Sequence, residues 1–354
     1  MPTKLSRRDF IRLCAGSAAA ISMTPLLAPL LTEAAEAGAP PVIWLQGAGC
    51  TGCSVSLLNT VHPDIQKVLL EVISLRYHPN ISGAAGDLAM EEGIFKVAEE
   101  YKGKFYLVVE GAVPTGANGK FCMVGERDGH HITFVDLVKE VGSKAAAILN
   151  FGTCSAYGGI PATPPNPTGC KSVPDIVKNV PYINVPGCPP HPDWMVGTIA
   201  HVLLYNDIPE LDRFGRPTMF FKDIIHDNCP RRQYFDNAIF AKNLSEPGCL
   251  LEVGCKGPIA HCDSTTRLWN GGTNWCIKSG APCLACTEPQ FPGWPVYARV
   301  PEMPIAPGIT ATTDQIGIVL GAATAVGIGG HLAGNIATGR IGPKKHSDEK
   351  DGDN

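Results

Sequence analysis

The chain has 354 residues, 44% hydrophobic and 18% charged, so it is long and apolar enough for two globular domains. Its formal net charge of −4, spread without basic blocks, argues against a nucleic-acid-binding protein. The 39 glycines and 31 prolines predict many loops shaped around something bound.

The N-terminal stretch is typical of an export signal. Ser6-Arg7-Arg8-Asp9-Phe10 precedes a weakly apolar segment, and small residues continue to Ala37. We interpret residues 1–37 as a twin-arginine signal peptide, which directs export of an already folded protein. The alternative is an ordinary basic N-terminus.

Residues 40–205 alternate between short apolar runs and helical patterns. The expected strands are Val42–Gln46, Leu69–Leu75, Phe105–Val109, Ala145–Phe151 and Tyr182–Val185. The expected helices are Ser54–Asn59, Asp87–Tyr101, Phe134–Gly142 and Ser172–Asn179. This alternation predicts an α/β domain with a doubly wound parallel sheet.

Three of the expected strands run directly into cysteines. Cys50 and Cys53 follow the first strand, Cys154 follows Ala145–Phe151, and Cys188 follows Tyr182–Val185. Ligands of open parallel sheets bind beyond the carboxyl ends of the strands, so these four thiols are expected to converge. Four thiolates with flanking glycines predict an iron–sulfur cluster site.

A second region, residues 215–305, is rich in cysteine and poor in regular structure. Six of the chain's 14 cysteines lie between Cys249 and Cys286, among glycines and prolines. Such a segment buries too little apolar surface to hold itself together. Disulfides, zinc or iron–sulfur clusters are therefore expected to hold it.

Iron–sulfur clusters explain the cysteine count best. Disulfides suit an exported protein, but Cys14 lies in the signal region, and folding before export occurs in a reducing compartment. Zinc suits paired cysteines, but the spacings here are irregular. The count gives three sets: Cys50, Cys53, Cys154 and Cys188; His226, Cys229, Cys249 and Cys255; Cys262, Cys276, Cys283 and Cys286. Cys14, Cys122 and Cys170 are left over, the last two as small buried apolar side chains.

The C-terminal stretch 315–339 has no charged side chain and is long enough to span a bilayer. Arg340, Lys344 and Lys345 follow it, which places the charged tail 340–354 in the cytoplasm and the body outside. The alternative is a buried core helix. His331 lies within the span, where a polar side chain is expensive. It is a candidate haem contact or a hydrogen-bonding partner of a neighbouring helix.

Taken together, the motifs resemble the small, electron-transfer subunit of periplasmic, membrane-associated nickel–iron hydrogenases. The matching stretches are Cys50-Thr51-Gly52-Cys53-Ser54, Gly152-Thr153-Cys154-Ser155-Ala156-Tyr157-Gly158-Gly159, Pro186-Gly187-Cys188-Pro189-Pro190-His191-Pro192, His226-x2-Cys229 and Cys283-x2-Cys286-x-Glu288-Pro289. The resemblance implies a flavodoxin-like domain with a proximal [4Fe–4S] cluster held by the first set. It also implies a loop-rich domain with a distal cluster on the second set and a medial cluster on the third.

Two departures from the family pattern are informative. Cys276 stands where many members have proline and a three-iron medial cluster, so we expect a medial [4Fe–4S] cluster, as in the selenium-containing relatives. A fourth thiolate should lower the potential of that cluster. Gly52 and Gly159 stand where oxygen-tolerant members carry extra cysteines, which implies a conventional proximal cluster and sensitivity to oxygen.

The implied activity is the interconversion of dihydrogen with protons and electrons. The nickel–iron site, or nickel–iron–selenium site, belongs to a separate large subunit, so no catalytic residue is expected in this chain. The small subunit passes electrons to a membrane cytochrome b, a periplasmic cytochrome c or a quinone-linked acceptor, at the periplasmic face of the cell membrane. Glu110 and His191 are candidates for a proton path or for hydrogen bonds around the proximal cluster, with salt-bridge or turn roles as alternatives.

Two other classes of function remain open on the sequence. One is the redox subunit of a quinone-reducing complex built on the same fold. Such proteins usually have adjacent cysteines at the first motif and lack the second domain. The other is an exported zinc protein without redox function, which would be colourless.

Overall fold

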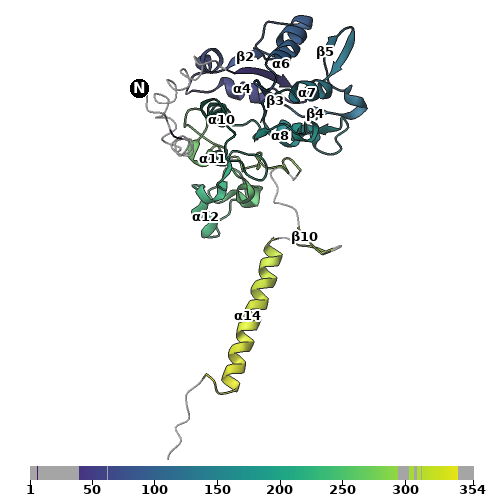
Figure 1. Cartoon of the computed structure of the whole chain (residues 1–354). Coiled ribbons are helices and arrows are strands. Elements are labelled where there is room, and N and C mark those ends of the chain that lie inside the picture. Colours follow the sequence, from purple (N-terminus) through teal and green to yellow (C-terminus); the bar gives the residue numbers. More distant parts are fainter. Residues whose placement is uncertain are drawn as a thin grey trace, which may run out of the picture. The chain divides into compact units, whose positions relative to one another are not determined.

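The computed structural model describes Ser6 and residues 40–61, 63–293, 303–306, 309–311 and 313–341. The chain divides into two compact units, Met1–Arg299 and Val300–Asn354 (Figure 1). Apart from Ser6, the expected signal peptide 1–37 lies outside the described residues, as does Cys14. Most of the expected tail 340–354 also lies outside them.

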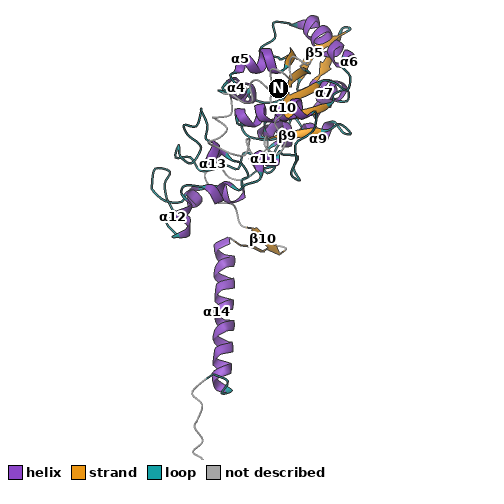
Figure 2. Ribbon diagram, turned by 60° about the vertical axis from the view of Figure 1, so that its left-hand side comes forward, coloured by secondary structure: helices purple, strands orange, loops and turns teal. Residues whose placement is uncertain are grey.

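A five-stranded parallel sheet is the centre of the first unit. Its strands are β1 (Pro41–Gln46), β2 (Ser74–Tyr77), β3 (Tyr106–Glu110), β7 (Ala147–Phe151) and β9 (Tyr182–Val185). They lie in the order β2-β1-β3-β7-β9, and every neighbouring pair is parallel (Figure 2). The order reverses between β1 and β3, and such a reversal opens a crevice at the carboxyl ends of the strands. The predicted parallel α/β fold is confirmed.

The helices that connect the strands match the sequence pattern in part. They are α4 (Gly52–Leu58), α5 (Ile65–Lys67), η1 (Val68–Val72), η2 (Leu88–Phe95), α6 (Lys96–Glu100), α7 (Phe134–Gly142), α8 (Thr153–Tyr157), η4 (Ile160–Ala162), α9 (Val173–Ile176) and α10 (Pro192–Tyr205). Small additions are η3 (Gly116–Gly119), the pair β4 (Val113–Pro114) and β8 (Cys170–Lys171), and the hairpin β5 (Met123–Arg127) and β6 (His130–Thr133). No sequence pattern had indicated α10, the longest helix of this unit.

One expected strand was wrong over half its length. Residues Leu69–Leu75 are split between the π-helical turn η1 and the strand β2, which begins at Ser74. Val68 and Val72, four positions apart, are buried, whereas Leu70 between them is 73% exposed. That burial follows one face of a helix rather than one face of a strand. Asp64 starts the helical stretch by accepting the Lys67 N–H at 3.0 Å.

The sheet separates two hydrophobic clusters. Ile43 and Leu45 of β1 face the cluster that contains α7, whereas Val42 and Trp44 face the cluster that contains α10. Side chains alternate in this way along a strand that is covered on both faces. Both faces of the sheet are therefore buried, which leaves the carboxyl edge as the place for a site.

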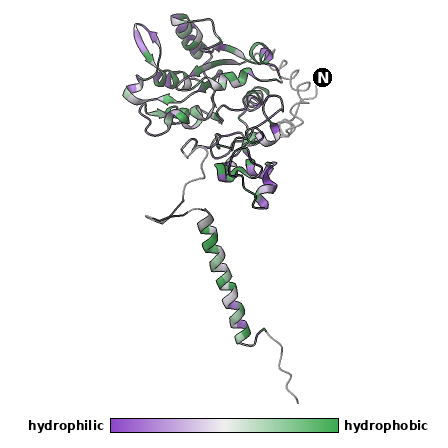
Figure 3. Ribbon diagram, turned by 180° about the vertical axis from the view of Figure 1, so that it is seen from behind, coloured by the Kyte–Doolittle hydropathy of each residue, from purple (hydrophilic) through white to green (hydrophobic). Residues whose placement is uncertain are grey.

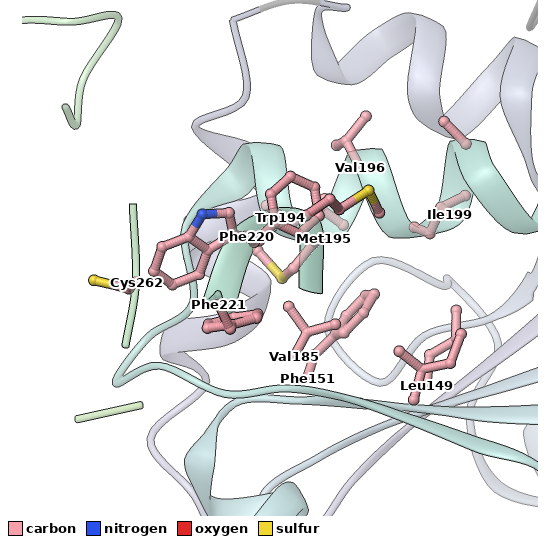
Figure 4. Packing of buried hydrophobic residues seen from close by; sticks show 14 of the residues in the cluster. Leu149, Phe151, Val185, Trp194, Met195, Val196, Ile199, Phe220, Phe221 and Cys262 are labelled. Atoms are coloured by element: carbon pink, nitrogen blue, oxygen red, sulfur yellow. The ribbon is translucent and has the colours of Figure 1, made fainter. Parts of the chain in front are cut away.

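The loop-rich part of the first unit shares the α10 cluster. Its short elements are α11 (Thr218–Phe221), η5 (Ile225–Asn228), α12 (Arg232–Asp236), η6 (Leu250–Val253), η7 (Gly257–Ile259) and α13 (Ser264–Arg267). Phe221 packs on Trp194 of α10 with ring centroids 4.9 Å apart, and Cys262 belongs to the same cluster (Figure 4). One core thus runs from the sheet into this region. The expected division near residues 205–215 stays a prediction.

The second unit contains the hairpin β10 (Met303–Ala306) and β11 (Ile309–Ala311), followed by α14 (Thr313–Ala337). Within the described residues, α14 is the one helix that is long and apolar enough to cross a membrane, over Ile316–Ala337. Figure 3 shows its mostly hydrophobic surface. The expected apolar segment 315–339 therefore forms a helix.

Candidate functional site

A cavity lies at the carboxyl edge of the sheet and is lined by all four thiols of the first set. Its walls come from the loops after β1, β3, β7 and β9, and its lining residues are Gly49, Cys50, Thr51, Gly52, Cys53, Glu110, Gly111, Gly152, Thr153, Cys154, Gly187, Cys188 and Pro189. Cys50 and Cys188 are exposed, whereas Cys53 and Cys154 are half-buried. The sheet therefore brings together four cysteines that are distant in sequence, as expected.

Glycines give the chain its close approach to these thiols. Gly152 has φ +92°, and a Cβ added there would lie 2.5 Å from Cys53 Sγ. Gly159 has φ +50°, and its Cβ would lie 2.9 Å from the backbone nitrogen of Cys154. Neither position accepts a side chain without a shift of the backbone or the thiol. The cavity is thus shaped by backbone that leaves room for a bulky group.

The first set is also an electrostatic unit. Burial raises the pKa of Cys53 well above the usual thiol value, and Glu110 and the other three thiols raise it further. Burial likewise raises the pKa of Cys154 to about 12, with Cys188 as the next contributor. Such thiols stay protonated and unreactive until a metal replaces their protons.

Glu110 forms one wall of the cavity and ends a directed hydrogen-bond chain. The Asn80 N–H donates to His78 Nδ1 at 3.1 Å, so the ring proton lies on Nε2, which faces Ser54 Oγ at 3.1 Å. The Ser54 hydroxyl and N–H both donate to Glu110 Oε2 at 2.8 Å. Burial raises the pKa of Glu110, while these bonds lower it. Sequence reasoning found Glu110 but missed His78, although His78 directly follows the carboxyl end of β2.

The other carboxylate oxygen of Glu110 is less well satisfied. The indole of Trp44 lies near enough to lower the pKa of Glu110. Within the described residues, however, neither Trp44 Nε1 nor Glu110 Oε1 makes a hydrogen bond of ordinary geometry. Glu110 therefore keeps an acceptor in the wall of the thiol-lined cavity.

The second set lines another cavity in the loop-rich region. Its walls are Ile225, His226, Cys229, Arg231, Cys249, Leu250, Cys255, Gly257 and Ile277. Within the described residues, His226 Nε2 is buried and has no hydrogen-bond partner. Burial, followed by the charge of Arg232, lowers the pKa of His226 and so favours the neutral imidazole. A neutral ring with a bare nitrogen beside three thiols is suited to bind a metal.

The third set is the most deeply buried. Burial raises the pKa of Cys262, Cys276 and Cys283, and raises that of Cys286 to about 12. Cys283 is affected by Cys262 and Cys286, and Cys286 is affected by Cys276. All four thiols thus lie within electrostatic reach of one another through these pairs.

Contacts join the three sets in series. Cys188 of the first set raises the pKa of Cys286 in the third, and the Thr153 hydroxyl donates to the Cys286 carbonyl oxygen. Cys255 of the second set raises the pKa of Cys283 in the third. The third set therefore lies between the other two.

The thiol spacing bears on the kind of group that fits. Among the residues described, no three His, Cys, Asp or Glu side chains approach closely enough to hold one metal ion. A single zinc ion needs its sulfurs about 2.3 Å from the metal, and so packed tightly together. Thiols spread around cavities, with glycine backbone between them, fit a polynuclear cluster better.

The remaining candidates lie elsewhere. His191 caps α10 by accepting the Asp193 N–H at 3.1 Å, and its Nε2 lies 2.7 Å from the Leu268 carbonyl oxygen. It is outside the lining of the first cavity. His331 is an exposed residue of α14. Cys122 and Cys170 line neither thiol cavity.

Comparison with known proteins gives consistent matches along the first unit. Residues 50–202 match the family described as NADH ubiquinone oxidoreductase, 20 Kd subunit. Residues 221–296 match the C-terminal family of the NiFe/NiFeSe hydrogenase small subunit, the part that the alternative quinone-reducing proteins usually lack.

Individual relatives agree with these families. The chain is 48% identical to the periplasmic [NiFeSe] hydrogenase small subunit of Desulfomicrobium baculatum over 305 residues, 81% of this chain and 96% of that protein. It is 38% identical to the quinone-reactive Ni/Fe-hydrogenase small chain of Wolinella succinogenes over 343 residues, 92% of this chain and 95% of that one.

A solved structure shows the same architecture. A crystal structure of a reduced, active form of the Ni-Fe-Se hydrogenase from Desulfomicrobium baculatum matches with a TM-score of 0.71 and 48% identity, covering 74% of this chain and 99% of that one. Fold, thiol-lined cavities and relatives together define an iron–sulfur electron-transfer subunit of an oxidoreductase. The chain belongs to the small subunits of the NiFe and NiFeSe hydrogenases, which act in a heterodimer with a large subunit.

Proposed function

We propose that this hydrogenase small subunit holds three [4Fe–4S] clusters on the three sets of side chains. The proximal ligands are Cys50, Cys53, Cys154 and Cys188; the medial ligands are Cys262, Cys276, Cys283 and Cys286; the distal ligands are His226, Cys229, Cys249 and Cys255. The serial contact of the sets, from Cys188 through Cys286 and Cys283 to Cys255, carries this proposal. A site between two others is what stepwise electron transfer requires.

The bound clusters supply one-electron redox chemistry, and this chain supplies their geometry and environment. Buried thiols such as Cys262 and Cys283 keep water from the medial site. The Ala285 N–H points to Cys283 Sγ at 3.4 Å, a contact that favours the thiolate. The bond-making step with dihydrogen belongs to the metal site of the large subunit.

The organisation of the body supports a flavodoxin-like domain over about residues 40–205 and a cluster domain over about 215–305. Numbered along the chain, the sheet strands lie in the order 2-1-3-4-5, the flavodoxin order. The two family matches are separated by a gap between residues 202 and 221, close to the proposed boundary.

The face that contains the first cavity is the proposed interface with the large subunit of the heterodimer. Cys50 and Cys188 reach the surface there, and Val55 and Leu58 of the adjacent α4 are 52% and 44% exposed. Exposed apolar side chains beside a redox site suit burial by a partner. The relative from Desulfomicrobium baculatum favours a large subunit with a Ni-Fe-Se site.

Gly159 supports a conventional proximal cluster. A cysteine at this position would need φ near +50°, and its Cβ would collide with the backbone of Cys154. The backbone is therefore unsuited to the extra ligand of an oxygen-tolerant cluster. We infer that the complex is sensitive to oxygen.

The proposed cellular place is the periplasmic face of the cell membrane. Export would use the twin-arginine signal 1–37, and α14 would anchor the chain, with the tail 340–354 in the cytoplasm. Electrons would leave at the His226 end for a cytochrome b, a cytochrome c or a quinone-linked acceptor. The quinone-reactive relative from Wolinella succinogenes supports a membrane acceptor. Haem contact by His331 stays a prediction.

A cysteine exchange tests the cluster assignment. Cys276→Ala should convert the medial site to a three-iron cluster, which gives an electron paramagnetic resonance signal in its oxidised state. Cys122→Ala, which changes a cysteine outside the sets, should leave the spectrum unchanged. A Cys276→Ala complex with the wild-type spectrum and iron content would contradict the medial assignment.

A further inference from the structure

Lys256 is a buried lysine in the loop between two of the thiol sets. Its side chain is only 1% exposed, although lysine is almost never fully buried without compensation. Nζ donates to the Gly254 carbonyl oxygen at 2.6 Å. The Lys256 N–H donates to the Cys283 carbonyl oxygen at 2.7 Å. The residue is therefore fixed at both its backbone and its ammonium group.

The ammonium faces one thiol from each of two sets. Burial lowers the pKa of Lys256, while Cys255 and Cys283 both raise it. Cys255 belongs to the proposed distal set and Cys283 to the medial set. Among the described thiols, these are also the pair through which the two sets affect each other. Lys256 thus lies where an electron would pass between the two sites.

A purely structural role does not require burial. Lysines often donate to carbonyl oxygens at the ends of helices while they remain in water, as Lys178 does with the Pro174 carbonyl oxygen at 2.6 Å. A buried ammonium is unfavourable unless negative charge lies nearby. Thiolates that carry iron supply such charge on both sides of Lys256. The burial therefore indicates an electrostatic role toward the clusters.

We propose that the Lys256 ammonium raises the reduction potentials of the medial and distal sites together. A reduced cluster carries one more negative charge than the oxidised form, so a fixed cation nearby favours the reduced state. Screening by solvent is weak because the side chain is buried. This inference rests on the proposed ligand sets.

The proximal site provides an internal comparison. Lys256 is absent from the charges that affect Cys53, Cys154 and Cys188, whereas it lowers the pKa of Cys255. Removal of the charge should therefore move the medial and distal potentials more than the proximal potential.

The test uses redox titration of the intact heterodimer, followed by electron paramagnetic resonance. Lys256→Gln removes the charge, Lys256→Arg keeps it, and Lys242→Gln removes an exposed lysine charge in the same region. Lys256→Gln should keep its full iron content. At a fixed ambient potential, it should shift the reduced-to-oxidised ratio of the medial and distal sites roughly tenfold toward oxidised, which is 59 mV for one electron. Lys256→Arg and Lys242→Gln should stay near wild type.

Three outcomes would overturn the account. A fully loaded Lys256→Gln complex with unshifted potentials would refute the electrostatic role. Loss of iron from Lys256→Gln, with iron retained in Lys256→Arg, would assign Lys256 to cluster assembly instead. Wild-type complex without iron–sulfur signals would contradict the proposed ligand sets themselves, independently of Lys256.

Discussion

Arg216 is the residue whose replacement we expect to destabilise the chain most clearly. Its side chain is 2% exposed, and NH1 donates to Glu288 Oε1 at 2.9 Å and to the Thr287 carbonyl oxygen at 3.0 Å. Its Nε also donates to Asp212 at 2.7 Å. Arg216 thereby fastens the segment after β9 to the segment that carries Cys286.

Arg216→Met keeps most of the aliphatic volume but removes the cation. Glu288, 4% exposed, would then be a buried carboxylate that only the His261 N–H, at 2.8 Å, and nearby polar groups stabilise. Breaking a buried ion pair on one side typically costs about 3–5 kcal/mol. For a unit of this size each kcal/mol lowers the midpoint temperature by about 2–4 °C, so the total shift is roughly 6–20 °C.

The assay is thermal unfolding of the anaerobic complex, followed by visible absorbance and tryptophan fluorescence at one scan rate. The control is Arg232→Met, which breaks an exposed pair with Asp236 at 2.9 Å and should cost less than about 1 kcal/mol. Arg216→Met combined with Glu288→Gln should recover part of the loss, because the unpaired charge disappears. An Arg216→Met complex as stable as the control, or a fully additive double variant, would refute the reasoning.

Three further predictions concern the cavity, the buried histidine and the C-terminal helix. Burial lowers the pKa of His78 from 6.5 to about 4. The folded chain therefore binds this proton more weakly than the unfolded chain, and should lose roughly 3 kcal/mol of stability as the pH falls through this range. His78→Gln should flatten that loss, as measured by midpoint temperatures between about pH 7.5 and about pH 5; equal slopes would contradict the buried neutral ring. Gly152→Ala should cost the proximal iron, because its Cβ would meet Cys53 Sγ at 2.5 Å, whereas Gly103→Ala, at φ +71° in open space, should keep full iron. Full iron in both variants would contradict the role of Gly152. A chain that ends before Thr313 should leave the membrane fraction yet still support hydrogen-dependent dye reduction; membrane retention would argue against α14 as the anchor.

Local pattern was sufficient for the sheet and for the thiols at its edge. β1, β3, β7 and β9 are short apolar runs, and their direct continuation into cysteines placed those cysteines at one edge. The pattern was insufficient for Leu69–Leu75, because helical and extended burial differ only by the exposure of Leu70. It was also insufficient for α10, which is apolar on several sides and has no clear helical period.

Long-range contacts were beyond the sequence pattern. His78 acts through Ser54, 24 positions away, and Arg216 meets Glu288 across 72 positions. Lys256 looked like an ordinary surface lysine beside a cysteine. Its burial depends on how the Cys283 segment folds over it, which no local periodicity records. Such side chains are chosen by tertiary packing, so they become visible only in three dimensions.

The central claim is that eleven cysteines and His226 hold three four-iron clusters. Iron and acid-labile sulfide analysis of the purified heterodimer, with Mössbauer spectroscopy to separate cluster iron from the large-subunit site, tests it most directly. We predict about twelve cluster iron atoms and about twelve sulfides for each small subunit. About eleven iron atoms would indicate a three-iron medial site. A natively folded complex without cluster iron would contradict the account.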